Sequence, residues 1–158
     1  MKLPLVAMLL LTNSIKRMKK RTQSCPLFLK TEVQTMTIIE AINRIDTLKP
    51  NTYAQETKVY WLSKLDGIIF DKIIKTHEGA EMEQFNGYSA ETPIDTKLIV
   101  SAPYDDIYIK WLEAQIDYAN REYDKYNNGI VAYNDAYTEY MRYYNRTHMP
   151  KGKSFKYF

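Results

Sequence analysis

The chain has 158 residues, of which 45% are hydrophobic and 26% charged, as expected for one globular domain with a real core. Its net charge of +3 is unevenly spread: residues 1–35 carry seven basic side chains and one acid, whereas residues 36–158 carry fifteen basic and eighteen acidic ones. The body of the chain is therefore acidic, which removes the main compositional argument for a nucleic-acid-binding protein.

The first 35 residues differ from the rest. Residues 3–12 are apolar but too few to span a bilayer, which takes about 20 residues, and most positive charges follow this run instead of preceding it as in a secretory signal. Residues 31–36 are what a ribosome-binding sequence before the codon for Met36 would encode if it were translated. We therefore predict Met36 as the natural start and residues 1–35 as a leader that is disordered or read as protein in error. An N-terminal membrane anchor is the alternative.

Two short amphipathic helices are predicted next. Thr37 and Glu40 have the spacing of a capping box, in which each side chain satisfies a free amide at a helix start. An apolar stripe follows and ends at Pro50. Residues 52–55 repeat the capping pattern, and a second stripe predicts a helix to about His77.

Residues 78–102 lose this periodicity and contain several turn-forming glycines and prolines, which predicts a long surface loop. Residues 98–100 are a short apolar run rich in β-branched side chains, which predicts one strand or an extended segment lying on the helices.

Residues 103–148 are predicted to form one long helix, because apolar and aromatic residues recur three or four positions apart from Ile109 to Tyr144 without a slip. Gly129 would weaken this helix and allow it to bend. Ten of the fourteen tyrosines lie in this region. A rod of about 60 Å needs partners to cover it. We therefore expect its aromatic seam to bind a partner chain; the alternative is that the rings cover the domain's own helices. The seam residues assigned to partner binding are Tyr133, Tyr137, Tyr140 and Tyr144.

Residues 149–158 are predicted to form an extended tail, in which lysines alternate with aromatic residues. We expect this tail to dock on a partner by strand addition or in a groove, the alternative being that it folds back on its own domain. Its partner-binding residues are Lys151, Lys153, Phe155, Lys156, Tyr157 and Phe158. The predicted fold is all-α, with two short helices on one long C-terminal helix, and the domain spans residues 36–148.

The sequence contains no recognisable catalytic pattern. His77 and Glu78 resemble the start of a zinc-protease helix, but the second histidine is missing and Gly79 breaks the helix. The acidic pairs at residues 105–106 and at residues 113 and 117 are predicted to lie on helix surfaces, with nothing to pair them across a cleft. We therefore predict no enzyme activity, no cofactor and no metal.

Several segments together resemble a group of small proteins encoded by tailed phages and prophages of Gram-positive gut bacteria. The similarity covers residues 36–158, and its most specific segments are residues 51–53, 61–67, 76–79, 102–105, 111–118, 125–128 and 143–153. The small helical make-up of that group is similar to the head-tail adaptor (connector) family. In adaptors of that kind, copies of a helical protein form a ring beneath the portal, and a C-terminal tail often engages the portal.

The resemblance implies a structural virion protein, assembled in the bacterial cytoplasm, that forms a homo-oligomeric ring and contacts the portal and other head-tail proteins. It would lie close to packaged DNA without reading its sequence, and it implies no membrane. One alternative is a small nucleic-acid-binding regulator that uses a basic run in the leader; the third hypothesis is a small membrane-associated protein. The basic run comprises Lys16, Arg17, Lys19, Lys20 and Arg21.

Overall fold

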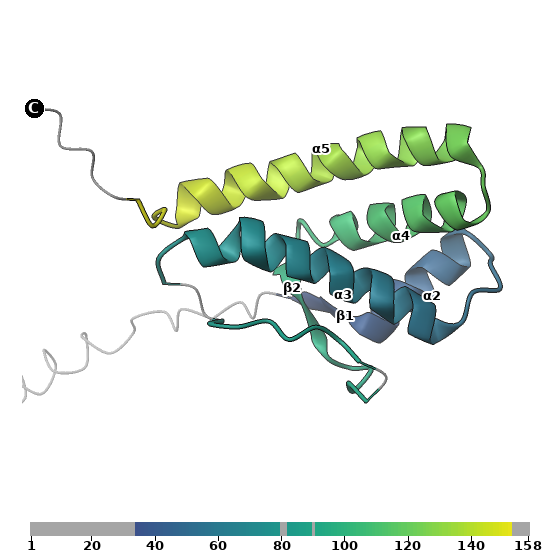
Figure 1. Cartoon of the computed structure of the whole chain (residues 1–158), viewed down its shortest axis with the longest axis horizontal. Helices are drawn as coiled ribbons and strands as arrows, with labels where there is room; N and C mark the ends of the chain where they lie inside the picture. The colour runs from purple at the N-terminus through teal and green to yellow at the C-terminus, as the bar shows by residue number, and fades with distance from the viewer. Residues whose placement is uncertain (1–33, 80–81, 90, 153–158) are drawn as a thin grey trace, which may run out of the picture. The chain divides into compact units, whose positions relative to one another are not determined.

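Figure 1 shows a computed structural model of the chain, which describes residues 34–79, 82–89 and 91–152. The chain divides into two units, residues 1–32 and residues 33–158, and every described residue belongs to the second unit. The predictions for the leader therefore lie outside the described residues. Within the described ranges, no helix combines the length and the apolar character that crossing a membrane requires.

The first helix, α2 (Ile38–Leu48), begins as predicted. The Glu40 amide donates to Thr37 Oγ1 at 3.3 Å, and the Thr37 amide donates to Glu40 Oε2 at 2.8 Å. These hydrogen bonds, the one from the Thr37 backbone first, hold the pKa of Glu40 below its usual value. The capping box is confirmed, and the predicted stripe is buried against the core at Ile38, Ala41, Ile42 and Ile45.

The second helix, α3 (Gln55–Lys72), begins without the predicted cap. Its N-cap residue is Ala54, which has no side-chain oxygen, so the capping pattern assigned to residues 52–55 is wrong. The helix ends earlier than His77, and a 3₁₀ turn, η1 (Ile74–Thr76), continues the chain.

A small antiparallel sheet joins β1 (Thr35–Thr37) to β2 (Lys97–Ser101). β2 confirms the strand predicted at residues 98–100, whereas β1 is an addition to the predicted all-α fold. In the register of the sheet, one residue of β1 lies opposite three residues of β2, which is a bulge. β1 starts at Thr35, and the Ala102 amide donates to the Gln34 carbonyl at 3.0 Å.

The prediction of one long helix over residues 103–148 is wrong. The chain forms two antiparallel helices, α4 (Asp106–Ala119) and α5 (Tyr123–Thr147), which lie side by side in Figure 1. The reversal occurs at residues 120–122, where Arg121 has a left-handed φ of 62° and the Glu122 amide donates to the Asp117 carbonyl at 2.9 Å. Residues 127–129, which include the glycine expected to allow a bend, are helical.

The tightness of this turn explains why the apolar pattern hid it. Ala119 ends one helix and Tyr123 begins the next, and four residues is also the spacing of neighbours along one face of a continuous helix. The two stripes therefore stay in phase across the turn, and in the structure each covers the other. In a rod, the apolar seam would need a partner chain to cover it. In the hairpin, the two halves of the seam cover each other.

Helix α4 lies at the centre of the domain, in contact with α2, α3 and α5. It is buried nearly all round, at Ile107, Tyr108, Ile109, Trp111, Leu112, Ala114 and Ile116. Helix α5 approaches it closely at Gly129, where an added Cβ atom would lie 3.5 Å from Ala114. This pair of small residues allows the two backbones to pack closely.

The contact at Gly129 distinguishes the hairpin from a rod. Gly129→Ala is expected to raise the free energy of unfolding by up to about 1 kcal/mol, because alanine favours the helix and its methyl group has room. Gly129→Leu is expected to lower it by about 1 to 3 kcal/mol, because the longer side chain meets the α4 backbone. Urea unfolding of both variants measures this difference. A leucine variant as stable as the alanine variant would contradict the hairpin.

Candidate functional site

Six aromatic rings gather at the C-terminal end of α5. The Tyr144 ring stacks on His148 with centroids 3.8 Å apart, and it meets the edge of His77 at 5.1 Å. Tyr104, before α4, stacks on Tyr143 at 4.6 Å. We call the aromatic cluster the set Tyr104, Tyr140, Tyr143, Tyr144, His77 and His148. It joins the end of α5 to the end of α3 and to the start of α4.

A cavity of about 430 Å³ lies beside the aromatic cluster. Its walls come from α5, from β2 and from the loop at Met82, and Lys97 is the one Lys, Arg, Asp or Glu among the lining residues that the structure describes. An aromatic wall with one cation can receive an apolar or aromatic group.

The base of the predicted tail is held against the domain. The Glu78 amide donates to the Met149 carbonyl at 2.7 Å, and the Lys151 amide donates to the Thr76 carbonyl at 2.7 Å. Between them, His77 and Pro150 form an antiparallel bridge. Residues 149–151 therefore run as a short strand along residues 76–78, so the base of the tail follows the prediction that it folds back on its own domain.

The tyrosines assigned to partner binding are used mostly inside the domain. Tyr133, Tyr140 and Tyr144 are 7%, 5% and 8% exposed, and Tyr133 packs on Trp111 with centroids 4.9 Å apart. Burial raises the pKa of Tyr133 to about 12 and moves that of Tyr140 upward as well. Tyr137 is half-buried. Their positions match the alternative prediction, in which the rings cover the domain's own helices.

Of the tail residues assigned to partner binding, only Lys151 belongs to the described part of the chain. Lys151 is exposed, and its ammonium donates to the Lys75 carbonyl at 3.2 Å. The other predicted contact residues lie outside the described residues: Lys153, Phe155, Lys156, Tyr157 and Phe158.

Large apolar side chains are exposed elsewhere on the described surface. Tyr118 and Tyr123 flank the α4–α5 turn, are 56% and 57% exposed, and lie 6.3 Å apart between ring centroids. Leu48 at the end of α2 is 67% exposed, and Val131 on α5 is 58% exposed. These side chains, which the prediction did not single out, offer apolar contact area outside the core.

A buried carboxylate that sequence reasoning missed lies at the centre of the domain. Asp66 on α3 is 0% exposed and accepts 2.6 Å hydrogen bonds from the hydroxyls of Tyr108 and Tyr88. It also accepts the Ile99 amide at 3.3 Å, and the Tyr108 hydroxyl accepts the Val100 amide at 2.8 Å. Both amides belong to the β2 bulge. Asp66 and Tyr108 therefore act as acceptors for two backbone donors of the bulge.

Burial raises the pKa of Asp66 to about 6, although its three hydrogen bonds act in the opposite direction. Every bond that the structure gives this carboxylate comes from the domain itself. The group acts as a structural acceptor. A signal was available, because Asp66 falls on the buried stripe of α3 between Leu62 and Ile69.

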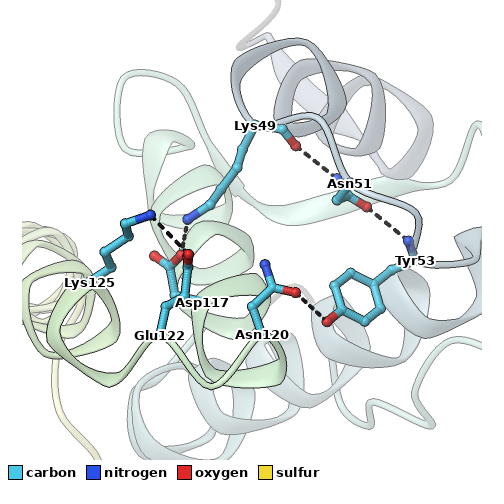
Figure 2. A network of polar contacts seen from close by, with 7 residues as sticks. All are labelled: Lys49, Asn51, Tyr53, Asp117, Asn120, Glu122 and Lys125. Carbon is cyan, nitrogen blue, oxygen red and sulfur yellow. Dashed lines mark hydrogen bonds and ion pairs between the residues drawn. The ribbon is translucent and has the colours of Figure 1, made fainter.

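A second polar network joins two turns of the fold (Figure 2). The Lys49 ammonium, after α2, forms an ion pair with Asp117 near the end of α4. The Tyr53 hydroxyl donates to Asn120 Oδ1 at 2.7 Å. The Asn51 side chain donates to the Lys49 carbonyl and accepts a hydrogen bond from the Tyr53 amide, so it links these two residues. The prediction that Asp117 lies on a solvated surface is wrong, because its side chain is 3% exposed. The network ties the α2–α3 connection to the α4–α5 turn.

The described residues contain no group of three or more His, Cys, Asp or Glu side chains arranged to hold a metal ion. Comparisons with protein-family models, with curated proteins and with solved structures found no match to this chain.

The pH dependence of stability tests the state of Asp66. The pKa of Asp66 is higher in the folded than in the unfolded chain. Its contribution to the free energy of unfolding is therefore fully present below about pH 4 and is lost as the pH rises through about 6. We expect the unfolding free energy, relative to that of Asp66→Asn, to fall by on the order of 3 kcal/mol between about pH 4 and about pH 7. Urea unfolding at both pH values measures this. A constant difference would mean that the carboxylate titrates normally.

The ion pair in Figure 2 gives a separate test. Lys49→Ala is expected to lower the free energy of unfolding by about 3 kcal/mol, because it leaves the buried Asp117 carboxylate without its cation. Lys110→Ala is the matched control: its pair with Asp106 is exposed and worth about 0.5 kcal/mol. Thermal or urea unfolding compares the two variants. Similar losses in both would show that the α2–α3 connection does not depend on this ion pair.

Proposed function

We propose that this chain is a structural protein of a phage virion, a head-tail adaptor that works as a ring at the portal through protein-protein contacts. The resemblance of residues 36–158 to small phage and prophage proteins supports the proposal. The predicted exposed aromatic rod gives no support, because the chain forms a hairpin in which α4 covers much of the aromatic seam of α5.

The use of the buried polar side chains is in keeping with a structural role. Asp66 bonds to β2 and α4, and Asp117 pairs with Lys49. Lys58 is 3% exposed and reaches Asp46 at 2.6 Å. Each of these groups joins separate parts of the fold.

The observation that carries the proposal is the fixed base of the tail. Two backbone hydrogen bonds and the His77–Pro150 bridge hold residues 149–151 beside residues 76–78. A basic and aromatic segment that follows such an anchor starts from a defined point on every copy. This arrangement suits a ring whose copies each present one tail to a common partner.

The exposed side chains at the α4–α5 turn provide the contact between copies in this proposal. Tyr118 and Tyr123 are more than half exposed and flank this turn, at the opposite end of α5 from the tail's anchor. A ring needs two complementary patches on each copy for its two neighbours, and a further surface for the portal. In this proposal the turn supplies one of the neighbour patches and the tail contacts the portal.

Removal of the tail tests the portal contact. A chain that stops after Gly152 keeps both hydrogen bonds of the anchor and is expected to bind the portal protein of the same phage at least tenfold more weakly, since three aromatic side chains are lost. Surface plasmon resonance measures the affinity, and circular dichroism checks that helicity is unchanged. Equal binding by the two chains would contradict the role of the tail, and absence of the protein from purified virions would contradict the proposed function.

A further inference from the structure

A groove lies along α3, and Lys75, one of its lining residues, directly precedes Thr76, which bonds to the base of the tail. Its volume is about 350 Å³, and it runs between one stripe of α3 and residues 83–86 of the following loop. Six of its lining residues give the groove its shape and charge: Gly67, Phe70, Asp71, Lys75, Glu83 and Phe85. Phe70 and Asp71 lie three and four positions after Gly67, so these three residues of α3 share one face of the helix, and Lys75 follows Asp71 by four positions.

The anchor of the tail leads the chain toward this groove. Met149 lies opposite Glu78, and Lys151 lies opposite Thr76, so the chain runs back toward the C-terminal end of α3. The Lys151 ammonium then donates to the carbonyl of Lys75, whose side chain lines the groove. Residues 152–158 therefore follow an anchor that contacts Lys75, one of the residues that line the groove.

The length of the remaining segment fits. Seven extended residues reach at most about 25 Å. The stripe from Lys75 to Gly67 covers about eight residues of helix, or about 12 Å. The segment can follow the whole groove without displacing its own anchor.

The chemistry of the groove complements that of the segment. Asp71 and Glu83 supply two carboxylates, and the opposing cation, Lys75, is already 3.5 Å from Asp71. That pair is weak, because both side chains are about two-thirds exposed. The segment brings Lys153 and Lys156, two ammonium groups three positions apart.

The floor of the groove is aromatic. The Phe70 and Phe85 rings lie 6.3 Å apart between centroids. The Phe85 ring packs close to α3 at Gly67, where an added Cβ atom would lie 3.8 Å from the ring. A ring from the tail can pack there against existing rings.

We propose that residues 153–158 dock in cis in the groove between α3 and residues 83–86, with Lys153 and Lys156 at Asp71 and Glu83 and an aromatic side chain over Phe85. The docked tail covers the groove of the free protein, and any partner of the tail competes with that groove. The inference goes beyond the proposed function and does not depend on it.

Carbodiimide crosslinking of the full chain tests the proposal, because it joins only amines and carboxylates in direct contact. Peptide mass spectrometry is expected to find Lys153 or Lys156 joined to Asp71 or Glu83. The yield should fall several-fold as salt rises from about 0.01 M to about 0.15 M, since the screening length shortens from about 30 Å to about 8 Å. In a mixture of ¹⁵N-labelled and unlabelled chains, the joined peptides should be wholly labelled or wholly unlabelled.

Matched variants separate docking from chance contact. Asp71→Asn with Glu83→Gln should abolish the crosslinks, whereas Asp106→Asn with Glu113→Gln, which changes two exposed acids of α4, should leave them unchanged. Truncation after Gly152 should shift the amide resonances of residues 67–75 and 83–86. Three results would overturn the proposal: crosslinks between labelled and unlabelled chains only, crosslinks spread equally over the control acids, or no crosslink together with unshifted resonances.

Discussion

The Asp66 carboxylate is the interaction on which the rest of the domain depends. In the bulge of β2, the Ile99 amide donates to Asp66 and the Val100 amide donates to the Tyr108 hydroxyl. Side chains from the helices therefore serve as acceptors for this strand. Because Asp66 belongs to α3 and Tyr108 to α4, the same hydrogen bonds fix the sheet against both helices. Loss of an acceptor buried this deeply leaves several donors unpaired at once.

The helical hairpin changes what kind of assembly the protein can make. A rod with an aromatic seam would have required a partner along its whole length, whereas the hairpin buries most of that seam within one chain. In the adaptor that we propose, contacts with other copies and with the portal fall to the ends of the hairpin: the exposed tyrosines at the turn and the anchored tail at the other end. The proposed cis docking adds a reason for the tail to be covered in the free protein.

Local patterns predicted the local structure well and the long-range structure poorly. The capping box at Thr37, the stripe of α2 and the strand at residues 98–100 depend on neighbours in sequence and were predictable. The turn at residues 120–122 was not, because its length preserves the helical phase of the apolar residues. The roles of Asp117 and Lys49 depend on a contact across 68 positions, which no local pattern encodes. Asp66 stood on a buried stripe and could have been recognised as a buried carboxylate, although its tyrosine partners could not.

Amide hydrogen exchange at Ile99 and Val100 tests the central claim most directly. If the Asp66 carboxylate and the Tyr108 hydroxyl hold these amides, both exchange only when the whole domain unfolds, with a free energy close to that of global unfolding. Exchange of the two amides at the rate of an exposed strand edge, while the helices remain protected, would contradict the claim that the carboxylate organises the sheet.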